Sequence, residues 1–140
     1  MQIILTALGL IPFALGSFMN RYLTAHPDSL PPFMFIAAIT LLLWGVIAFW
    51  IKPYAGGTRN VVIGLNTLAL LVLVLIGIQE LILQAYWNHA IGVWTQLYFL
   101  PLLHLGFTLT RWSHSVFSAY CAAFLLMVGA ALLGCKLRKT

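Results

Sequence analysis

The chain has 140 residues, of which 63% are hydrophobic, seven are Lys or Arg and two are Asp or Glu. So little charge excludes a soluble domain and indicates a membrane protein, because the rare charges separate long apolar runs. The net charge of +5 does not indicate nucleic-acid binding, since Lys and Arg between membrane segments set orientation and meet lipid headgroups.

Five apolar runs follow one another along the chain. Each is long enough to cross a bilayer as a helix, and helices satisfy their own backbone hydrogen bonds in lipid. The first run follows no Lys or Arg, so we interpret it as a membrane helix and not as a signal peptide. The sequence predicts an all-α polytopic membrane bundle with a single domain and five transmembrane segments, at 3–19, 32–51, 61–86, 92–110 and 116–135.

The fourth run, 92–110, is ambiguous. It contains Gln96, Pro101 and His104, and such residues weaken membrane insertion. The alternative topology therefore has four spans and a re-entrant segment at 92–110. This alternative obeys the positive-inside rule better, because it leaves only Arg21 and Arg111 opposite the other basic residues. Both topologies predict a cytoplasmic C-terminus because the tail is basic.

Glu80 is the only acidic residue inside an apolar run. At about 100° per residue, Asn66, Gly77, Glu80 and Gln84 share one helical face. One interpretation is a proton or cation site, since ionisable groups within membranes mark transport pathways. The other is a structural role, because polar side chains also join membrane helices to one another or reach the interface.

His104 and Arg111 lie on one face of the fourth run. Arg111 can approach Glu80 only if this run does not cross the membrane. No two histidines have the spacing of metal ligands, so we expect neither a metal nor a cofactor.

Small residues recur at helical spacing in several runs, where they allow helix backbones to approach closely. In the first run Phe13 separates two glycines, and Pro12 predicts a kink. The predicted packing positions are Gly9, Gly16, Gly45, Gly77, Ala130 and Gly134.

Three functions remain open from the sequence. The first is a structural or accessory membrane subunit without enzymatic activity. The second is a small oligomeric channel or a proton- or cation-coupled transporter that uses Glu80. The third is a lipid-acting enzyme that uses Glu80, His104 and Arg111. Expected partners are membrane lipids, with a homo-oligomer or a larger membrane complex also compatible, and the plasma membrane is the expected location.

Overall fold

The computed structural model describes residues 1–139, and its secondary-structure elements in that range are all helices. Four of its helical stretches are long and apolar enough to cross a membrane, so the predicted helical membrane bundle is confirmed. The elements in chain order are α1 (Gln2–Leu8), α2 (Ile11–Ala25), α3 (Phe33–Ile51), α4 (Thr58–Gly77), the π-helix η1 (Ile78–Ile82), α5 (Ala90–Tyr98), α6 (Leu100–Leu109) and α7 (Val116–Leu137).

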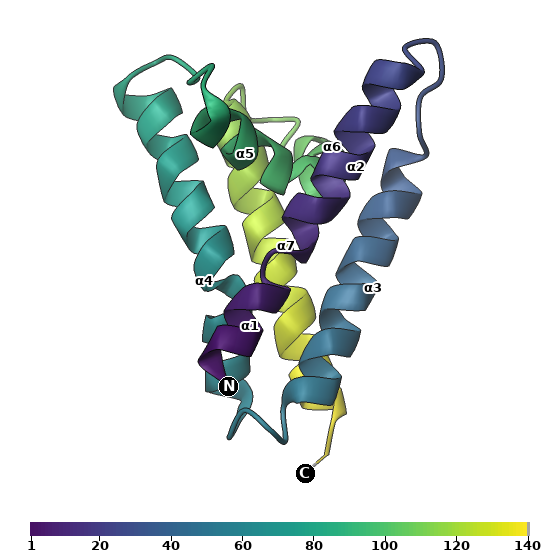
Figure 1. Ribbon diagram of the computed structural model, residues 1–140, viewed down its shortest axis with the longest axis vertical. Helices are drawn as coiled ribbons and strands as arrows, with labels where there is room; N and C mark the ends of the chain where they lie inside the picture. Colours follow the sequence, from purple (N-terminus) through teal and green to yellow (C-terminus); the bar gives the residue numbers. More distant parts are fainter. Residues whose placement is uncertain (140) are drawn as a thin grey trace.

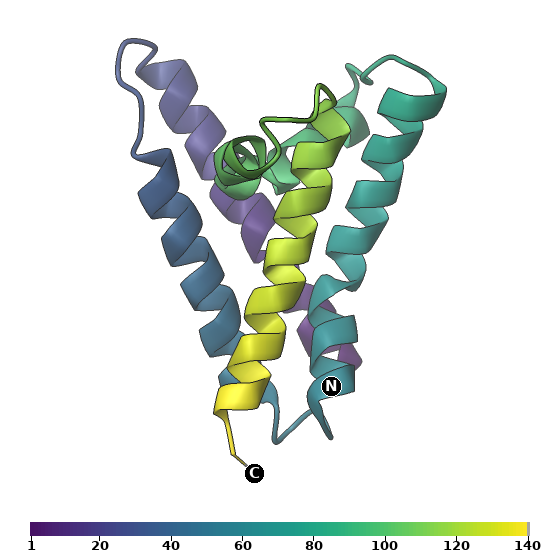
Figure 2. The ribbon, with the colours of Figure 1, turned by 180° about the vertical axis from the view of Figure 1, so that it is seen from behind.

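The long helices run alternately up and down (Figure 1). The pair α1–α2 rises from the lower end, α3 descends, α4 rises and α7 descends. Both chain ends therefore lie at the lower end of the bundle, and the view from behind in Figure 2 gives the same arrangement.

The pair α5–α6 occupies the ambiguous fourth run. Its two helices meet at a bend of 58°, and by length and composition the pair could count as a fifth span. However, α4 ends and α7 begins at the same end of the bundle (Figures 1 and 2). The contact between Glu80 of η1 and the backbone N–H of Phe117 in α7 requires this proximity. The pair therefore leaves from and returns to one end, as in the re-entrant alternative.

Two prolines account for the interrupted helices. Pro12 and Pro101 are each the second residue of a helix, α2 and α6. A proline at this position cannot donate the hydrogen bond that would continue the preceding helix, so a break before it costs little. The third apolar run also ends earlier than predicted, at Ile82, because Gln84 has a φ of 49° that a right-handed helix cannot contain.

The core lies around α7, which packs against α3, α4 and α6. Trp44, Leu65, Phe99 and Met127 are among its largest buried side chains. Phe99 comes from the bend between α5 and α6, so the re-entrant pair supplies part of the core and does not lie on its surface.

Candidate functional site

Glu80 joins the end of α4–η1 to the beginning of α7. Its Oε1 accepts the backbone N–H of Phe117 at 2.9 Å and the hydroxyl of Ser115 at 3.3 Å. Its Oε2 accepts the hydroxyl of Tyr86 at 2.8 Å. Both carboxylate oxygens are therefore bonded to groups of the same chain.

This arrangement caps α7 from another helix. Ser115 is the residue before the first turn of α7, and its own side chain makes no capping hydrogen bond. The first N–H groups of a helix lack intrahelical partners, and the helix dipole favours negative charge beside them. The carboxyl group of Glu80 supplies the acceptor for one of these N–H groups, that of Phe117. Gly77, one turn earlier, packs against the ring of Phe117 and leaves room for this approach.

Tyr86 lies in the loop that follows η1, outside the membrane-spanning helices. Partial burial and the hydrogen bond to Glu80 together raise the pKa of its hydroxyl above the usual range. The hydroxyl therefore stays protonated and remains a donor to the carboxylate at physiological pH.

Gln79 is the polar residue that sequence periodicity missed. It is fully buried, and its side-chain oxygen accepts the backbone N–H of Trp87 at 3.0 Å. Its amide nitrogen donates to Thr95 Oγ1 of α5 at 3.1 Å and to the carbonyl of Leu75. The π-helix explains the omission, because an i→i+5 turn changes which residues face inward after Gly77.

Asn66 and Gln84, predicted on the Glu80 face, lie elsewhere in the structure. Asn66 is buried and accepts the indole N–H of Trp44 at 3.3 Å, about 21 Å from Glu80 at 1.5 Å per residue. Gln84 is exposed and lies beyond the helix. Neither contributes a hydrogen bond to the Glu80 carboxylate.

His104 and Arg111 are not among the residues bonded to Glu80, which are Tyr86, Ser115 and Phe117. His104 is exposed, and its ring stacks on Phe33 with centroids 5.4 Å apart. Arg111 is exposed beyond the end of α6. Within residues 1–139, no three His, Cys, Asp or Glu side chains are close enough together to hold a metal ion.

The predicted packing residues lie at several helix contacts. A Cβ added to Gly134 of α7 would collide with the Gly45 backbone of α3, and one added to Gly16 of α2 would collide with the Leu97 carbonyl of α5. A Cβ on Gly45 would lie 3.3 Å from the Ala130 carbonyl. The remaining predicted glycine, Gly9, is buried where α1 meets α2.

Comparisons with protein families, with curated proteins and with solved structures found no match to this chain. The geometry around Glu80 holds two helix ends and one loop together. Both of its carboxylate oxygens accept hydrogen bonds from donors of the same chain.

Proposed function

We propose that this integral membrane protein is a structural or accessory subunit of a membrane assembly, in which its intramembrane polar groups hold its own helices together. One observation carries the proposal: both oxygens of the Glu80 carboxylate are bonded to Tyr86, Ser115 and Phe117. A carboxylate whose two oxygens both accept hydrogen bonds from its own chain holds the bonded elements together.

The other interior polar groups support the same role. Gln79 bonds across to Thr95, and Trp44 bonds across to Asn66. Within residues 1–139, every buried side-chain nitrogen or oxygen has a hydrogen-bond partner. Satisfied polar contacts of this kind fix the register of membrane helices.

The charge distribution supports an orientation with the lower end in the cytoplasm. That end carries most of the basic side chains, and the positive-inside rule then directs both termini to the cytoplasm, in the plasma membrane. The assembly itself would be a homo-oligomer or a larger complex. The basic side chains at the lower end of the bundle are Lys52, Arg59, Lys136, Arg138 and Lys139.

Substitution of Glu80 tests the proposal. Glu80→Gln keeps an acceptor for the Phe117 N–H, so we expect little change in thermal unfolding in detergent. Glu80→Leu leaves α7 uncapped and should cost about 1–2 kcal/mol. Asp28→Leu, which removes the other acid from the loop between α2 and α3, is the matched control and should be neutral.

Native electrophoresis of the tagged chain from its own membranes adds a second measurement. A structural subunit should migrate in a defined assembly well above its own 15.5 kDa, and Glu80→Leu should reduce that assembly. Migration as a single chain, or unchanged stability of Glu80→Leu, would contradict the proposal.

A channel or cation-coupled transporter is the second candidate, favoured by the re-entrant pair α5–α6. Backbone that turns within the membrane is tolerated where it is packed in protein or lines a water path. If the chain transports protons, Glu80→Gln should abolish proton flux in proteoliposomes while leaving unfolding unchanged. Equal flux in wild type, Glu80→Gln and empty liposomes would exclude this candidate. We do not propose the lipid-acting enzyme, because the Glu80 carboxylate is bonded to Tyr86, Ser115 and Phe117, whereas the His104 ring stacks on Phe33.

A further inference from the structure

The lower end of the bundle gathers cations from two distant parts of the chain. Lys52, just after α3, donates from its Nζ to the carbonyl of Arg138, just after α7, at 2.8 Å. The two acidic side chains of the sequence are at the other end, Asp28 in the α2–α3 loop and Glu80 in η1 (Figure 1). Neither acid neutralises this cluster.

These cations surround a cleft of about 420 Å³. Its other walls come from the loop between α3 and α4, where Gly56 and Gly57 have φ values of 73° and 132°. Side chains rarely adopt these angles, so the loop presents bare backbone to the cleft. The lining residues are Lys52, Pro53, Gly56, Gly57, Arg138 and Lys139.

Arg138 is held in place before any ligand arrives. Its Nη1 donates to the carbonyls of Phe49 and Trp50 at 3.2 and 3.4 Å. Its guanidinium carbon lies 5.3 Å from the centre of the Phe49 ring. Both hydrogen bonds use Nη1, and a guanidinium has five N–H groups in a planar fork, so another edge can still bind a phosphate.

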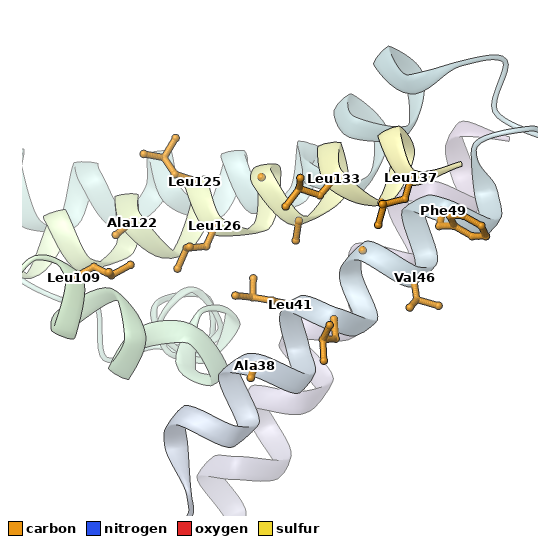
Figure 3. Close-up of a pocket in the computed structure, with 15 residues that line it drawn as sticks. Ala38, Leu41, Val46, Phe49, Leu109, Ala122, Leu125, Leu126, Leu133 and Leu137 are labelled. Carbon is orange, nitrogen blue, oxygen red and sulfur yellow. The ribbon is translucent and has the colours of Figure 1, made fainter. Parts of the chain in front are cut away.

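An apolar groove of about 840 Å³ runs between α3 and α7, with Leu109 of α6 at one end (Figure 3). On α3 it extends from Ala38 to Phe49, about 16 Å at 1.5 Å per residue. That length is close to one leaflet, about half of the 30 Å hydrocarbon core. The groove is therefore of a size to hold acyl chain from a single leaflet.

The groove and the cleft adjoin. Phe49 and Leu137 line the groove, whereas Lys52 and Arg138 line the cleft. Lys52 follows Phe49 by about one helical turn, and Arg138 follows Leu137 directly. The apolar groove and the basic cleft are thus lined by neighbouring residues at the lower ends of α3 and α7.

We propose that the α3–α7 groove and its basic cleft bind one anionic phospholipid, with an acyl chain in the groove and the phosphate at Lys52, Arg138 and Lys139. The charge of the cleft selects an anionic headgroup, and the groove selects a molecule with a chain. This inference is independent of the function proposed above.

Titration of the purified full chain in detergent tests the headgroup. We expect phosphatidylglycerol to bind more tightly than phosphatidylcholine in native mass spectrometry and to raise the unfolding temperature further. Lys52→Gln and Lys139→Gln should each weaken phosphatidylglycerol binding about fivefold. Arg21→Gln and Arg111→Gln, at the opposite end, should have no effect.

The groove is tested with Gly129→Leu. Gly129 lines the groove, and a Cβ there meets no atom within 4 Å, so the variant should fold while filling the space. We expect weaker binding of phosphatidylglycerol, whereas Val74→Leu on exposed α4 surface should change nothing.

Three results of the binding measurements would overturn the proposal. They are equal binding of the two lipids, equal loss in the variants of Arg21 and Arg111, or unchanged binding in Gly129→Leu. Inorganic phosphate alone should not raise the unfolding temperature. A rise equal to that with phosphatidylglycerol would show an anion site without a lipid site and would also overturn the proposal.

Discussion

Two apolar runs of this chain, the first and the fourth, are each interrupted before a proline. The first run continues across the bundle, whereas the fourth turns back. In the first run α1 stops before α2, yet the two together form one stretch long enough to cross the membrane. In the fourth run α5 and α6 bend by 58° and return to the end from which they came (Figure 1). Pro12 and Pro101 occupy the same position in the helix that follows each break.

The difference between the two breaks comes from distant contacts. After the second break, Gly106 of α6 packs against the backbone of Ala119 in α7, and Glu80 holds the beginning of α7 beside η1. At the first break, α1 packs along α4 while α2 packs against α5 and α6. Proline therefore determines where a membrane helix breaks, and tertiary packing determines where the chain goes next.

The two breaks also contact each other. The hydroxyl of Tyr98, the last residue of α5, donates to the carbonyl of Gly9 at 2.8 Å. Gly16 lies against the carbonyl of Leu97, the residue whose usual helical donor would be the missing N–H of Pro101. Each interruption thus lies beside polar or close-packed groups from the other, as interrupted helices in lipid require.

The largest test of this comparison is topology. If the first run crosses and the fourth returns, reporter fusions at Met1 and Thr140 should both report the cytoplasmic side. Five full crossings would place the two reporters on opposite sides. Such a result would mean that α5–α6 spans the membrane in spite of its bend.

Gly16→Ala should produce the largest change in stability. The added Cβ would collide with the Leu97 carbonyl, a backbone atom that cannot move without shifting α5. We expect a loss of about 1–3 kcal/mol in thermal or denaturant unfolding in detergent. Gly129→Ala is the matched control, since its Cβ meets open space, and it should stay within about 0.5 kcal/mol. Equal effects in both variants would contradict the close packing of α2 on α5.

Tyr98→Phe should produce a smaller change. It removes the hydroxyl that reaches the Gly9 carbonyl and keeps the buried ring, which is 2% exposed. Interhelical hydrogen bonds in membranes are worth about 0.6 kcal/mol on average, so we expect a loss near that value. No loss, together with unchanged hydrogen exchange around Gly9, would show that the two breaks are energetically independent.

Much of the fold was predictable from the sequence, because a long apolar run indicates a membrane-spanning helix. Run 32–51 and helix α3 differ by one residue at the start, and 116–135 and α7 differ by two at the end. For 92–110 the sequence predicts a fifth span with a re-entrant segment as the alternative, and composition cannot decide between them because it gives no information on contacts such as that between Glu80 and Phe117. Positive charge favoured the re-entrant alternative, and the structure has that arrangement of chain ends.

The polar site was less predictable than the fold. Glu80 stands out in the sequence, but its partners Ser115 and Phe117 lie 35 and 37 residues away. Gln79 could not be placed by a period of 3.6 residues, because η1 departs from that period at the residues concerned. A π-helix has no simple sequence signal, so the buried amide emerges only from the structure.

The bond from Phe117 to Glu80 also closes a loop of the chain. Glu80 and Phe117 are 37 positions apart in the sequence, and the residues between them include the whole re-entrant pair α5–α6. Closing a loop lowers chain entropy, so contacts such as this one must offset that cost. The hydrogen bond to the carboxylate thus couples the packing of α5 and α6 to the packing of α7. Removal of this hydrogen bond, as in Glu80→Leu, should raise amide hydrogen exchange throughout residues 81–116 as one cooperative unit.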